Sequence, residues 1–344
     1  MVRDKVLFSF KAFVETLERA DKVVLITDHT VESLYGKEFI ASLGRGDLPL
    51  FSFAPGEASK VRKTRDALED FLVDSGADRK TVLIALGGGV VTDLVGFVAS
   101  TYMRGIAYVS VPTTLMAMAD AAIGGKTAIN HPLVKNLLGA IYPPEAVYID
   151  KIFLNSLSAK EKMGGWLEMI KISLVLKESL FTKIEKGEAS LETILKEAIL
   201  LKKKVVREDP YDKGVRLLLN FGHTWAHALE ALYKFTISHG EALQVGLLAE
   251  SYHSYRSGIF PLEALERVIA LIERFNEPFL SLENIDPHLL YKEMERDKKG
   301  INSIPRVIML EKIGRGIYNR PLSFDDVKET LAWLQSGLLQ NSAQ

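Results

Sequence analysis

Residues 81–97 read TVLIALGGGVVTDLVGF, and this stretch decides how the first half of the chain folds. Its first six residues have the length and apolar composition of a buried strand, and the residues after the glycines favour a helix. Gly87, Gly88 and Gly89 form the turn between them. Glycines there let the main chain approach a ligand closely, and the N–H groups that begin a helix attract phosphate. The stretch predicts a strand–turn–helix unit, either as a tight turn alone or as a nucleotide site.

The same alternation continues on both sides of this stretch. Further strands are predicted at residues 22–27, 48–53, 107–111 and 146–149, and an amphipathic helix at residues 60–75. Strands that alternate with helices indicate βαβ units and a largely parallel sheet. The glycines do not match the G-x-G-x-x-G pattern, so the common dinucleotide fingerprint is absent. We therefore expect a Rossmann-like α/β fold, but the glycine turn alone does not identify the ligand that this fold binds.

The pattern changes after residue 150. Helices are predicted at residues 158–184, 191–207, 222–233, 240–257 and 261–275, with a short edge strand or hairpin at residues 306–310 and a fraying tail at residues 336–344. We expect two domains: an α/β dinucleotide-binding domain over residues 1–152, and a mainly α-helical metal- and substrate-binding domain over residues 153–344.

The composition excludes several classes of function. With 344 residues, 47% of them hydrophobic, and a net charge of −1, the chain has no basic excess of the kind that nucleic-acid binding requires. It has no cysteine, which rules out disulfides, thiolate metal ligands and cysteine nucleophiles. No uncharged apolar run reaches membrane-spanning length, and the N-terminus lacks a secretory pattern. We expect a cytoplasmic enzyme without nucleic-acid or membrane partners.

Histidines cluster in one short segment of the second half. His223 and His227 are four residues apart, so they share one helical face, and His239 begins the next helix-forming run. Imidazole and carboxylate groups are ligands that zinc and similar divalent metals favour. From spacing alone, the prediction is that His223, His227 and His239 bind one metal ion.

Three further segments each allow a structural or a functional interpretation. Glu168 and Lys171 share a helical face, as a solvated ion pair does. Thr113 and Thr114 follow a strand, where threonines cap helices or bind phosphate and ribose hydroxyls. Lys126 follows two glycines, as cations do in anion sites, but the segment is not a P-loop because Asp120 occupies the position of its first glycine.

Taken together, these segments resemble the 3-dehydroquinate synthases of the sugar-phosphate cyclase superfamily. The matching motifs are GGGVVTDLVGF, RG-(x)6-PTTL, DAAIGGKT, VKNLLG, EMIK, LNFGHTWAHA, SHGEA and RDKK, in the family's order. The chain departs from the family pattern at Ala122, Ser156, Leu167, Ile172, Ser173 and Ala226, none of which removes a charged or metal-binding group.

The resemblance implies a site of three parts, placed between the two domains. The metal ligands would be Glu168, His223 and His239, which leaves His227 for proton transfer and substrate contact. The NAD contacts would be Asp28, Glu57, Lys60, Gly88, Gly89, Asp93, Thr113 and Thr114. The remaining substrate contacts would be Arg104, Asp120, Lys126, Asn136, Lys171, Lys202, Arg216, Asn220, Lys298 and Lys299.

The implied reaction converts 3-deoxy-D-arabino-heptulosonate 7-phosphate to 3-dehydroquinate and phosphate, the second step of the shikimate pathway. Bound NAD and one divalent metal, zinc or cobalt, would support transient oxidation, phosphate elimination, re-reduction and an intramolecular aldol closure. The resemblance also implies that this protein is a homodimer.

Three alternatives stay open at the level of sequence. Another sugar-phosphate cyclase, making 2-deoxy-scyllo-inosose or a valiolone, shares the scaffold and metal ligands, although Arg216, Asn136 and the RDKK segment favour a carboxylated substrate. A metal-dependent polyol dehydrogenase shares the two-domain plan but forms NADH in net amounts. A catalytically inactive scaffold protein would have no need of this set of cations and metal ligands.

Overall fold

The computed structural model describes residues 5–132, 134–275, 280–296 and 304–336. The chain divides into two compact units, Met1–Leu157 and Ser158–Gln344, called here the N-terminal and C-terminal units. The sequence-based boundary after residue 152 falls inside the 3-10 helix η5 (Lys151–Ser156) at the end of the first unit. The predicted tail, apart from its first residue, lies outside the described residues.

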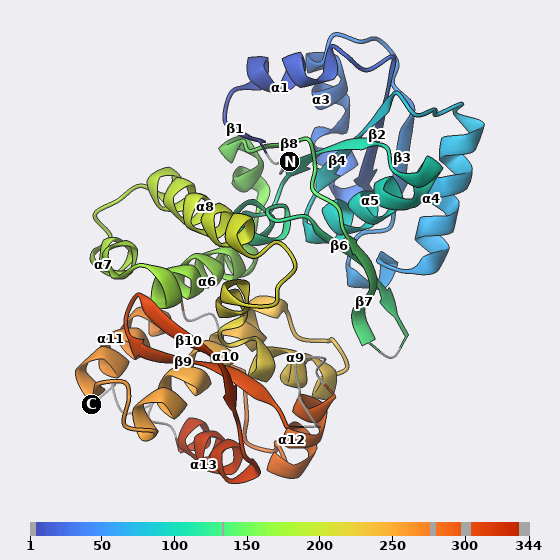
Figure 1. Ribbon diagram of the computed structural model, residues 1–344. Helices are drawn as coiled ribbons and strands as arrows, with labels where there is room; N and C mark the ends of the chain where they lie inside the picture. The colour runs from blue at the N-terminus through green and yellow to red at the C-terminus, as the bar shows by residue number, and fades with distance from the viewer. Residues whose placement is uncertain (1–4, 133, 276–279, 297–303, 337–344) are drawn as a thin grey trace. The chain divides into compact units, whose positions relative to one another are not determined.

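The N-terminal unit is built on a six-stranded sheet of order β1-β8-β5-β4-β2-β3, in which all paired neighbours run parallel (Figure 1). Its strands are β1 (Lys5–Leu7), β2 (Lys22–Asp28), β3 (Leu50–Phe53), β4 (Thr81–Gly87), β5 (Ala107–Pro112) and β8 (Ala146–Tyr148). Its α-helices are α1 (Phe10–Leu17), α2 (His29–Val31), α3 (Lys37–Ser42), α4 (Arg62–Asp74) and α5 (Gly89–Thr101). The predicted α/β fold class is confirmed.

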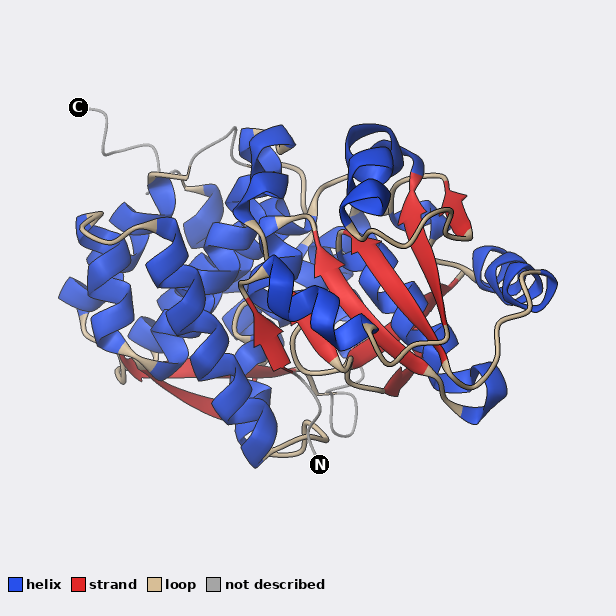
Figure 2. Ribbon diagram, turned by 90° about the horizontal axis from the view of Figure 1, so that it is seen from above, coloured by secondary structure: helices blue, strands red, loops and turns tan. Residues whose placement is uncertain are grey.

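Both faces of this sheet are covered. Successive side chains of a strand point to opposite faces, and Ile84 and Ala85 of β4 are both fully buried. Ala85 belongs to the core cluster formed with α4 and α5. Figure 2 shows blue helices flanking the red strands. A strand buried on both faces must be apolar throughout, which explains why residues 81–86 have no polar alternation.

The strand order creates a switch point at the carboxyl edge of the sheet. The chain passes from β2 outward to β3, whereas from β4 it continues in the opposite direction to β5 and β8. The loops that follow β2 and β4 therefore diverge, and the edge between such strands is where parallel α/β sheets bind ligands. The glycine turn at Gly87–Gly89 lies at this edge.

A separate antiparallel hairpin, β6 (Lys126–His131) with β7 (Val134–Ile141), extends the N-terminal unit. The sequence analysis predicted no strands here. The hairpin packs on α5, where Gly96 makes room for it: an added Cβ would lie 2.4 Å from Thr127 Cγ2. The close packing shows that the hairpin is an integral part of this unit.

The C-terminal unit is mainly helical, as predicted. Its helices are α6 (Ala159–Leu176), α7 (Glu178–Lys186), α8 (Leu191–Glu208), the 3-10 helix η6 (Val215–Asn220), α9 (His223–Leu232), α10 (His239–Arg256), α11 (Leu262–Glu273), α12 (Pro287–Glu295) and α13 (Phe324–Gln335). The strands β9 (Arg306–Lys312) and β10 (Arg315–Pro321) form an antiparallel hairpin across them (Figure 1). Leu310 N donates to Ser254 Oγ at 2.9 Å, which fastens this hairpin to α10.

The predicted single helix over residues 158–184 is wrong, because the chain breaks between α6 and α7. Lys177 has an extended backbone, with φ −158° and ψ 105°. The turn of the β9–β10 hairpin causes the break: Gly314 N donates to the Leu174 carbonyl at 2.7 Å, and an added Cβ on Gly314 would lie 2.2 Å from Glu178 N. This contact comes from a distant segment, so local sequence patterns cannot reveal it.

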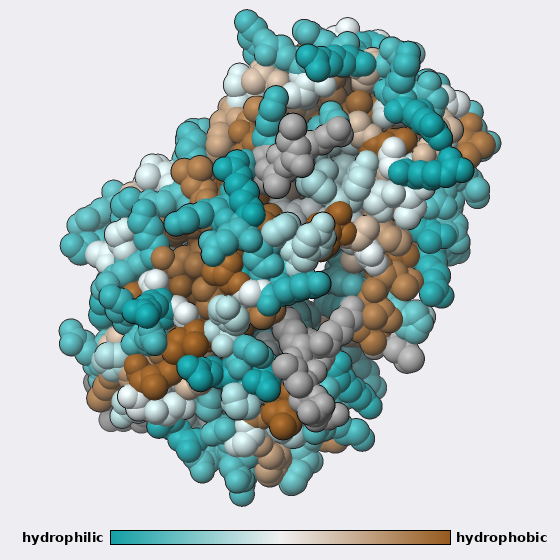
Figure 3. Space-filling model, viewed as in Figure 1, coloured by the Kyte–Doolittle hydropathy of each residue, from teal (hydrophilic) through white to brown (hydrophobic). Residues whose placement is uncertain are grey.

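The surface carries mostly polar and charged side chains on the face that Figure 3 draws. Small brown patches lie between the charged side chains. Among the described residues, no helix combines the length and the apolar character needed to cross a membrane.

Candidate active site

Three elements of the C-terminal unit bring a carboxylate and two imidazoles together. Glu168 comes from the middle of α6, while His223 and His239 are the first residues of α9 and α10. Glu168 Oε1 lies 3.1 Å from His239 Nε2 and 3.7 Å from His223 Nε2. One ligand atom from each residue fits within 4.8 Å of the others, so the three residues could hold one metal ion.

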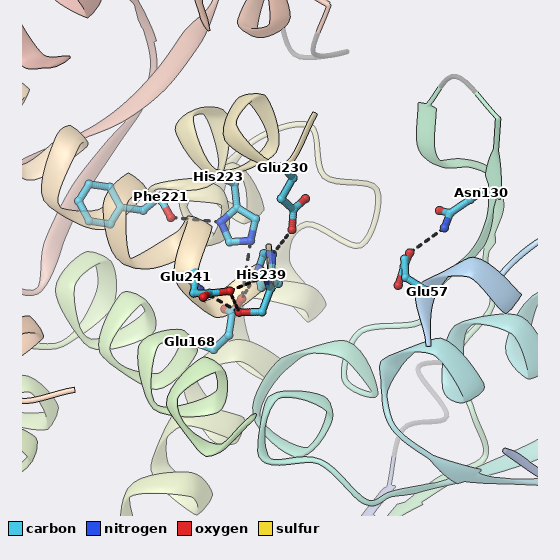
Figure 4. Close-up of polar contacts among 9 residues, drawn as sticks. Glu57, Asn130, Glu168, Phe221, His223, Glu230, His239 and Glu241 are labelled. Atoms are coloured by element: carbon cyan, nitrogen blue, oxygen red, sulfur yellow. Dashed lines mark hydrogen bonds and ion pairs between the residues drawn. The ribbon is translucent and has the colours of Figure 1, made fainter. Parts of the chain in front are cut away.

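Both imidazoles are oriented through their other ring nitrogen. His239 Nδ1 donates to Glu230 Oε1 at 3.2 Å, and His223 Nδ1 donates to the Phe221 carbonyl at 3.2 Å (Figure 4). In a neutral ring with its proton on Nδ1, the lone pair of Nε2 is available to a metal ion. Metal-bound histidines are typically held in this way by a carboxylate or carbonyl behind them.

The charges around His239 favour a cation. Burial by itself would lower the pKa of His239, but hydrogen bonds to Glu168 and Glu230, together with their charges, outweigh burial and raise the pKa to about 10. The two carboxylates are almost completely buried. A divalent metal would neutralise them in place of the proton.

Close helix packing sets the positions of these ligands. Gly222, the N-cap residue directly before α9, is in the left-handed region, with φ 79°, which favours glycine. An added Cβ on Gly246 of α10 would lie 2.0 Å from the Gly222 carbonyl oxygen, so α9 and α10 are in contact through their main chains. Ser238 caps α10 in a capping box with Glu241, which fixes where that helix starts.

His227 does not belong to the three-residue metal group. It lies one turn along α9, is exposed, and its ring centroid is 5.4 Å from that of His223. The hypothesis from spacing, with three histidines on one ion, therefore lacks geometric support. The group that the structure brings together is the one implied by the family resemblance.

Several predicted substrate residues of this unit are buried cations. Lys171 is 1% exposed and pairs with Glu168, so a solvated ion pair is excluded. Lys202 and Arg216 are also buried, although Lys204 of the same lysine run is exposed. Buried cations of this kind are retained where an anion compensates them. Asn220 ends η6, directly before the turn into α9.

The predicted nucleotide residues of the N-terminal unit follow neighbouring strands. Thr113 and Thr114 come directly after β5, beside the glycine turn after β4. The two loops are in close contact: Thr113 N donates to the Gly87 carbonyl at 3.0 Å, and an added Cβ on Gly88 would lie 3.0 Å from Thr114 Cγ2. Asp28 ends β2 and caps α2 through hydrogen bonds from Thr30 N and Val31 N.

A polar network lies beside this edge. Lys60 Nζ donates to Asp93 Oδ2 at 2.5 Å and to Asn136 Oδ1 at 2.6 Å. Burial raises the pKa of Asp93, and the positive charge of Lys60 opposes that rise. Glu57 accepts a 2.7 Å hydrogen bond from Asn130, a residue that the sequence analysis did not single out. The network joins four residues with predicted functions: Glu57, Lys60, Asp93 and Asn136.

The other predicted substrate residues are dispersed. Arg104 is exposed and has φ 68° in the turn after α5. Asp120 lies in the π-helical turn η4 (Ala117–Ala121), and Lys126 begins β6 with an exposed side chain. Lys298 and Lys299 lie outside the described residues.

Comparisons with known proteins identify the family. The family model described as 3-dehydroquinate synthase N-terminal matches residues 50–164, and the C-terminal model of the same family matches residues 165–300. The chain belongs to the 3-dehydroquinate synthase family. A 3-dehydroquinate synthase from Streptococcus pneumoniae is 37% identical over 329 residues, which cover 93% of this chain and 92% of that protein. A 3-dehydroquinate synthase from Streptococcus suis is 38% identical over 336 residues, which cover 94% of this chain and 93% of that protein.

Solved structures of other sugar-phosphate cyclases share the fold. A 2-epi-5-epi-valiolone synthase from Streptomyces hygroscopicus subsp. jinggangensis, solved with NAD+ and Zn²⁺ bound, matches with a TM-score of 0.88 at 28% identity, covering 97% of this chain and 96% of that one. A 2-deoxy-scyllo-inosose synthase complexed with carbaglucose-6-phosphate, NAD+ and Co²⁺ matches with 0.82 at 26% identity, covering 95% of each chain. A Schizosaccharomyces pombe glycerol dehydrogenase, at 0.65 and 15% identity over 99% of this chain and 92% of that one, shares the fold alone.

Proposed function

We propose that this protein is a lyase that converts 3-deoxy-D-arabino-heptulosonate 7-phosphate to 3-dehydroquinate and phosphate in aromatic amino acid biosynthesis. The observation that carries the proposal is the group Glu168, His223 and His239 in a chain whose relatives are 3-dehydroquinate synthases over nearly all of its length. The same family resemblance supports two further proposals, a homodimeric state and a cytoplasmic location.

The three residues of the metal group fit a divalent cation, zinc or cobalt. They offer two imidazole nitrogens and one carboxylate, the ligand types that zinc takes in catalytic sites, and they leave coordination positions for substrate oxygens. When bound there, the metal supplies Lewis-acid polarisation of a substrate hydroxyl. Glu230 and the Phe221 carbonyl hold the two rings so that Nε2 is the ligand atom.

We propose that NAD binds at the carboxyl edge of the parallel sheet, where it supplies a transient hydride acceptor. The glycine turn after β4 and the threonines after β5 lie side by side there. Gly88 and Gly89 allow the pyrophosphate to approach the main chain, and the N-terminus of α5 favours its negative charge. Glu57, Lys60, Asp93, Thr113, Thr114 and Asp28 would complete the contacts to the cofactor.

The remaining residues suit an anionic, hydroxyl-rich substrate. Cations bind phosphate and carboxylate through charge-assisted hydrogen bonds. In this proposal Arg104, Lys126, Lys298 and Lys299 serve the phosphate, and Arg216 serves the carboxylate. His227 transfers protons, and Asp120, Asn136, Lys171, Lys202 and Asn220 position the hydroxyl groups.

One assay tests the proposed reaction. The purified protein is incubated with the heptulosonate phosphate, catalytic NAD+ and zinc, and phosphate, dehydroquinate and absorbance at the NADH band are followed. We expect equal amounts of phosphate and dehydroquinate with no accumulation of NADH. Folded, metal-loaded protein that produces neither product would overturn the proposal, and net NADH formation would indicate a dehydrogenase.

Matched variants test the assigned roles in the same assay. Glu168→Ala and His239→Ala should lose bound metal together with activity. His227→Ala should retain the metal and lose turnover, because its ring lies outside the metal group. Loss of zinc in the His227 variant would instead support the model with three histidine ligands.

A second candidate is a cyclase that acts on a sugar phosphate without a carboxylate. The TM-scores of 0.88 to a valiolone synthase and of 0.82 to a 2-deoxy-scyllo-inosose synthase solved with carbaglucose-6-phosphate favour it. The buried guanidinium of Arg216 argues against it, because we assign this group to a substrate carboxylate. Turnover of glucose 6-phosphate, with no turnover of the heptulosonate phosphate, would favour this second candidate.

A further inference from the structure

A closed ring of hydrogen bonds joins the turn at Glu57–Lys60 to the β6–β7 hairpin. Asn130 contributes three of them: Nδ2 donates to Glu57 Oε1 at 2.7 Å, Oδ1 accepts from Asn136 N at 2.9 Å, and its main-chain N–H donates to the Lys60 carbonyl at 2.7 Å. Figure 4 shows the amide of Asn130 directed at the carboxylate of Glu57. The side-chain amide of Asn130 thus donates to Glu57 and accepts from Asn136.

Lys60 closes the ring. Its Nζ donates to Asn136 Oδ1 at 2.6 Å and to Asp93 Oδ2 at 2.5 Å, and its side chain is buried. Lys60 N also donates to the Glu57 carbonyl at 3.1 Å, which fixes the two ends of the turn. A single lysine therefore contacts α5, through Asp93, and the hairpin, through Asn136.

The ring also stabilises an unfavourable backbone conformation. Asn136 has φ 52°, in the left-handed region that residues other than glycine rarely adopt, although asparagine tolerates it best. Its main-chain N–H and its side-chain oxygen are both bound within the ring. The conformation that directs the Asn136 side chain therefore depends on Asn130 and Lys60.

We propose that Asn130 is a positioning residue that couples the cofactor-binding turn to the substrate-binding hairpin. This role rests on the proposed function, in which Glu57 and Lys60 contact NAD and Asn136 contacts the substrate. Asn130 touches neither ligand; it orders the residues that do. Binding of NAD at Glu57 and Lys60 would order the hairpin before the substrate arrives, and the coupling is reciprocal.

Two substitutions separate the two links. Asn130→Ala removes both side-chain hydrogen bonds. Asn130→Asp keeps an acceptor for Asn136 N but places a carboxylate against Glu57, where two like charges repel. Asn155→Ala, which changes an exposed asparagine of η5 in the same unit, is the matched control.

The first measurement is the affinity for NAD+, by titration calorimetry on the full chain without substrate. We expect the dissociation constant to rise roughly tenfold in Asn130→Ala and at least as much in Asn130→Asp, and to stay unchanged in Asn155→Ala. The second measurement is steady-state kinetics at saturating NAD+. The KM for the heptulosonate phosphate should rise in Asn130→Ala and stay close to wild type in Asn130→Asp, which keeps the link to Asn136.

The pH dependence of Asn130→Asp distinguishes positioning from general damage. Between about pH 7 and pH 5, one of the two facing carboxyls takes up a proton and can donate to the other, so NAD+ affinity should recover relative to wild type at the same pH. The other charged groups of the network are Lys60 and Asp93, and His131 is adjacent to Asn130 in the sequence. All three residues are the same in wild type and in Asn130→Asp, so their titration cancels in the comparison. Asn130→Ala should show no recovery.

Unchanged NAD+ affinity in Asn130→Ala, or an Asn130→Asp variant without recovery at low pH, would overturn the proposal. Amide hydrogen exchange offers a readout that needs no ligand: exchange along β7 should speed up in Asn130→Ala and not in Asn155→Ala. Wild-type protein that binds no NAD+ would overturn the proposed function, and with it this role of Asn130.

Discussion

At the scale of single residues, the candidate metal site depends on groups that do not touch the ion. Glu230 is almost fully buried and accepts from His239 Nδ1, so it fixes both the tautomer and the orientation of that ring. The Phe221 carbonyl does the same for His223. A side-chain substitution cannot remove the Phe221 carbonyl. Glu230, in contrast, can be replaced without changing any of the three metal-binding residues, so it can be tested.

We expect Glu230→Ala to weaken metal binding by roughly 10–100-fold and Glu230→Gln to weaken it less, because glutamine keeps an acceptor for His239 Nδ1. Competition against a chromogenic chelator measures the affinity, and the absorption spectrum of the cobalt form reports the coordination geometry. Glu266→Ala, on the exposed face of α11, is the control. Equal zinc affinity in Glu230→Ala and in the control would refute this role.

The sequence alone locates most of this site, but the spacing of its residues does not identify the three metal ligands correctly. The spacing of His223 and His227 predicts a shared helical face, which the structure has, and His239 does begin a helix. Spacing cannot identify Glu168, because α7, α8 and η6 lie between its helix and α9, and only tertiary packing places it beside the histidines. The family motif supplied Glu168 where local patterns could not.

At the scale of secondary-structure elements, the contact between α9 and α10 sets the geometry of the site. We expect Gly246→Ala to destabilise the protein by about 3 kcal/mol or more, since its Cβ would overlap the Gly222 carbonyl and force the helices apart. Because each helix begins with a metal-binding histidine, zinc affinity should fall as well. Thermal unfolding and metal titration check both expectations.

Gly36→Ala is the matched control for that substitution. Gly36 has a negative φ, and an added Cβ would approach only the flexible side chain of Glu32, at 3.3 Å. It should change stability by well under 1 kcal/mol. Normal stability in Gly246→Ala would mean that α9 and α10 can separate freely.

A second contact between elements, an ion pair from α11 to α7, predicts that the free energy of unfolding depends on pH. Arg267 donates two parallel hydrogen bonds to Glu185, at 2.9 and 2.7 Å, and this pairing lowers the pKa of Glu185 from 4.5. A lowered folded-state pKa gives stability that is present above pH 4.5 and is lost as the pH falls through the folded-state value. Because Arg267 is one-third exposed, we expect Glu185→Gln to lose only about 0.5–1 kcal/mol at neutral pH.

Urea unfolding of wild type and Glu185→Gln at pH 7 and pH 4 measures this difference. The difference in unfolding free energy between the two proteins should be smaller at pH 4, because below pH 4.5 Glu185 binds a proton more readily in the unfolded wild-type chain than in the folded one. Glu192→Gln, which breaks the exposed Lys196 pair, should have a smaller effect. A gap that stays constant with pH would show that the Glu185 charge contributes nothing.

Two of the strands that the sequence analysis missed, β1 and β7, lack the apolar pattern of a buried strand. Strands β2, β4 and β5 are buried, and their apolar runs were found within one or two residues at each end. Strand β7 is half exposed along its whole length and β1 has three residues, so neither carries a clear apolar pattern. The break at Lys177 depends on Gly314, more than a hundred residues further along the chain.

At the scale of the whole molecule, the two proposed cofactors should stabilise the protein independently. A ligand at one hundred times its dissociation constant adds about 2.7 kcal/mol to the free energy of unfolding. We expect both zinc and NAD+ to raise the unfolding temperature of wild type. In His239→Ala, zinc should have no effect while NAD+ should act as before. Differential scanning fluorimetry checks this, and an equal zinc effect in that variant would contradict the metal assignment.

The parallel pairing of β1 with β8 has a consequence for synthesis in the cell. Lys5 pairs with Ala146, so β1 has to wait for β8, which is made about 140 residues later and is the last strand of this unit. At roughly 5–20 residues per second, this delay on the ribosome lasts on the order of ten to thirty seconds. In the last part of that time, after residue 112 has been made, β5 has an unpaired, apolar edge, because β8 is also its partner. The nascent chain is therefore most vulnerable to aggregation, and most dependent on chaperones, until residue 148 has emerged.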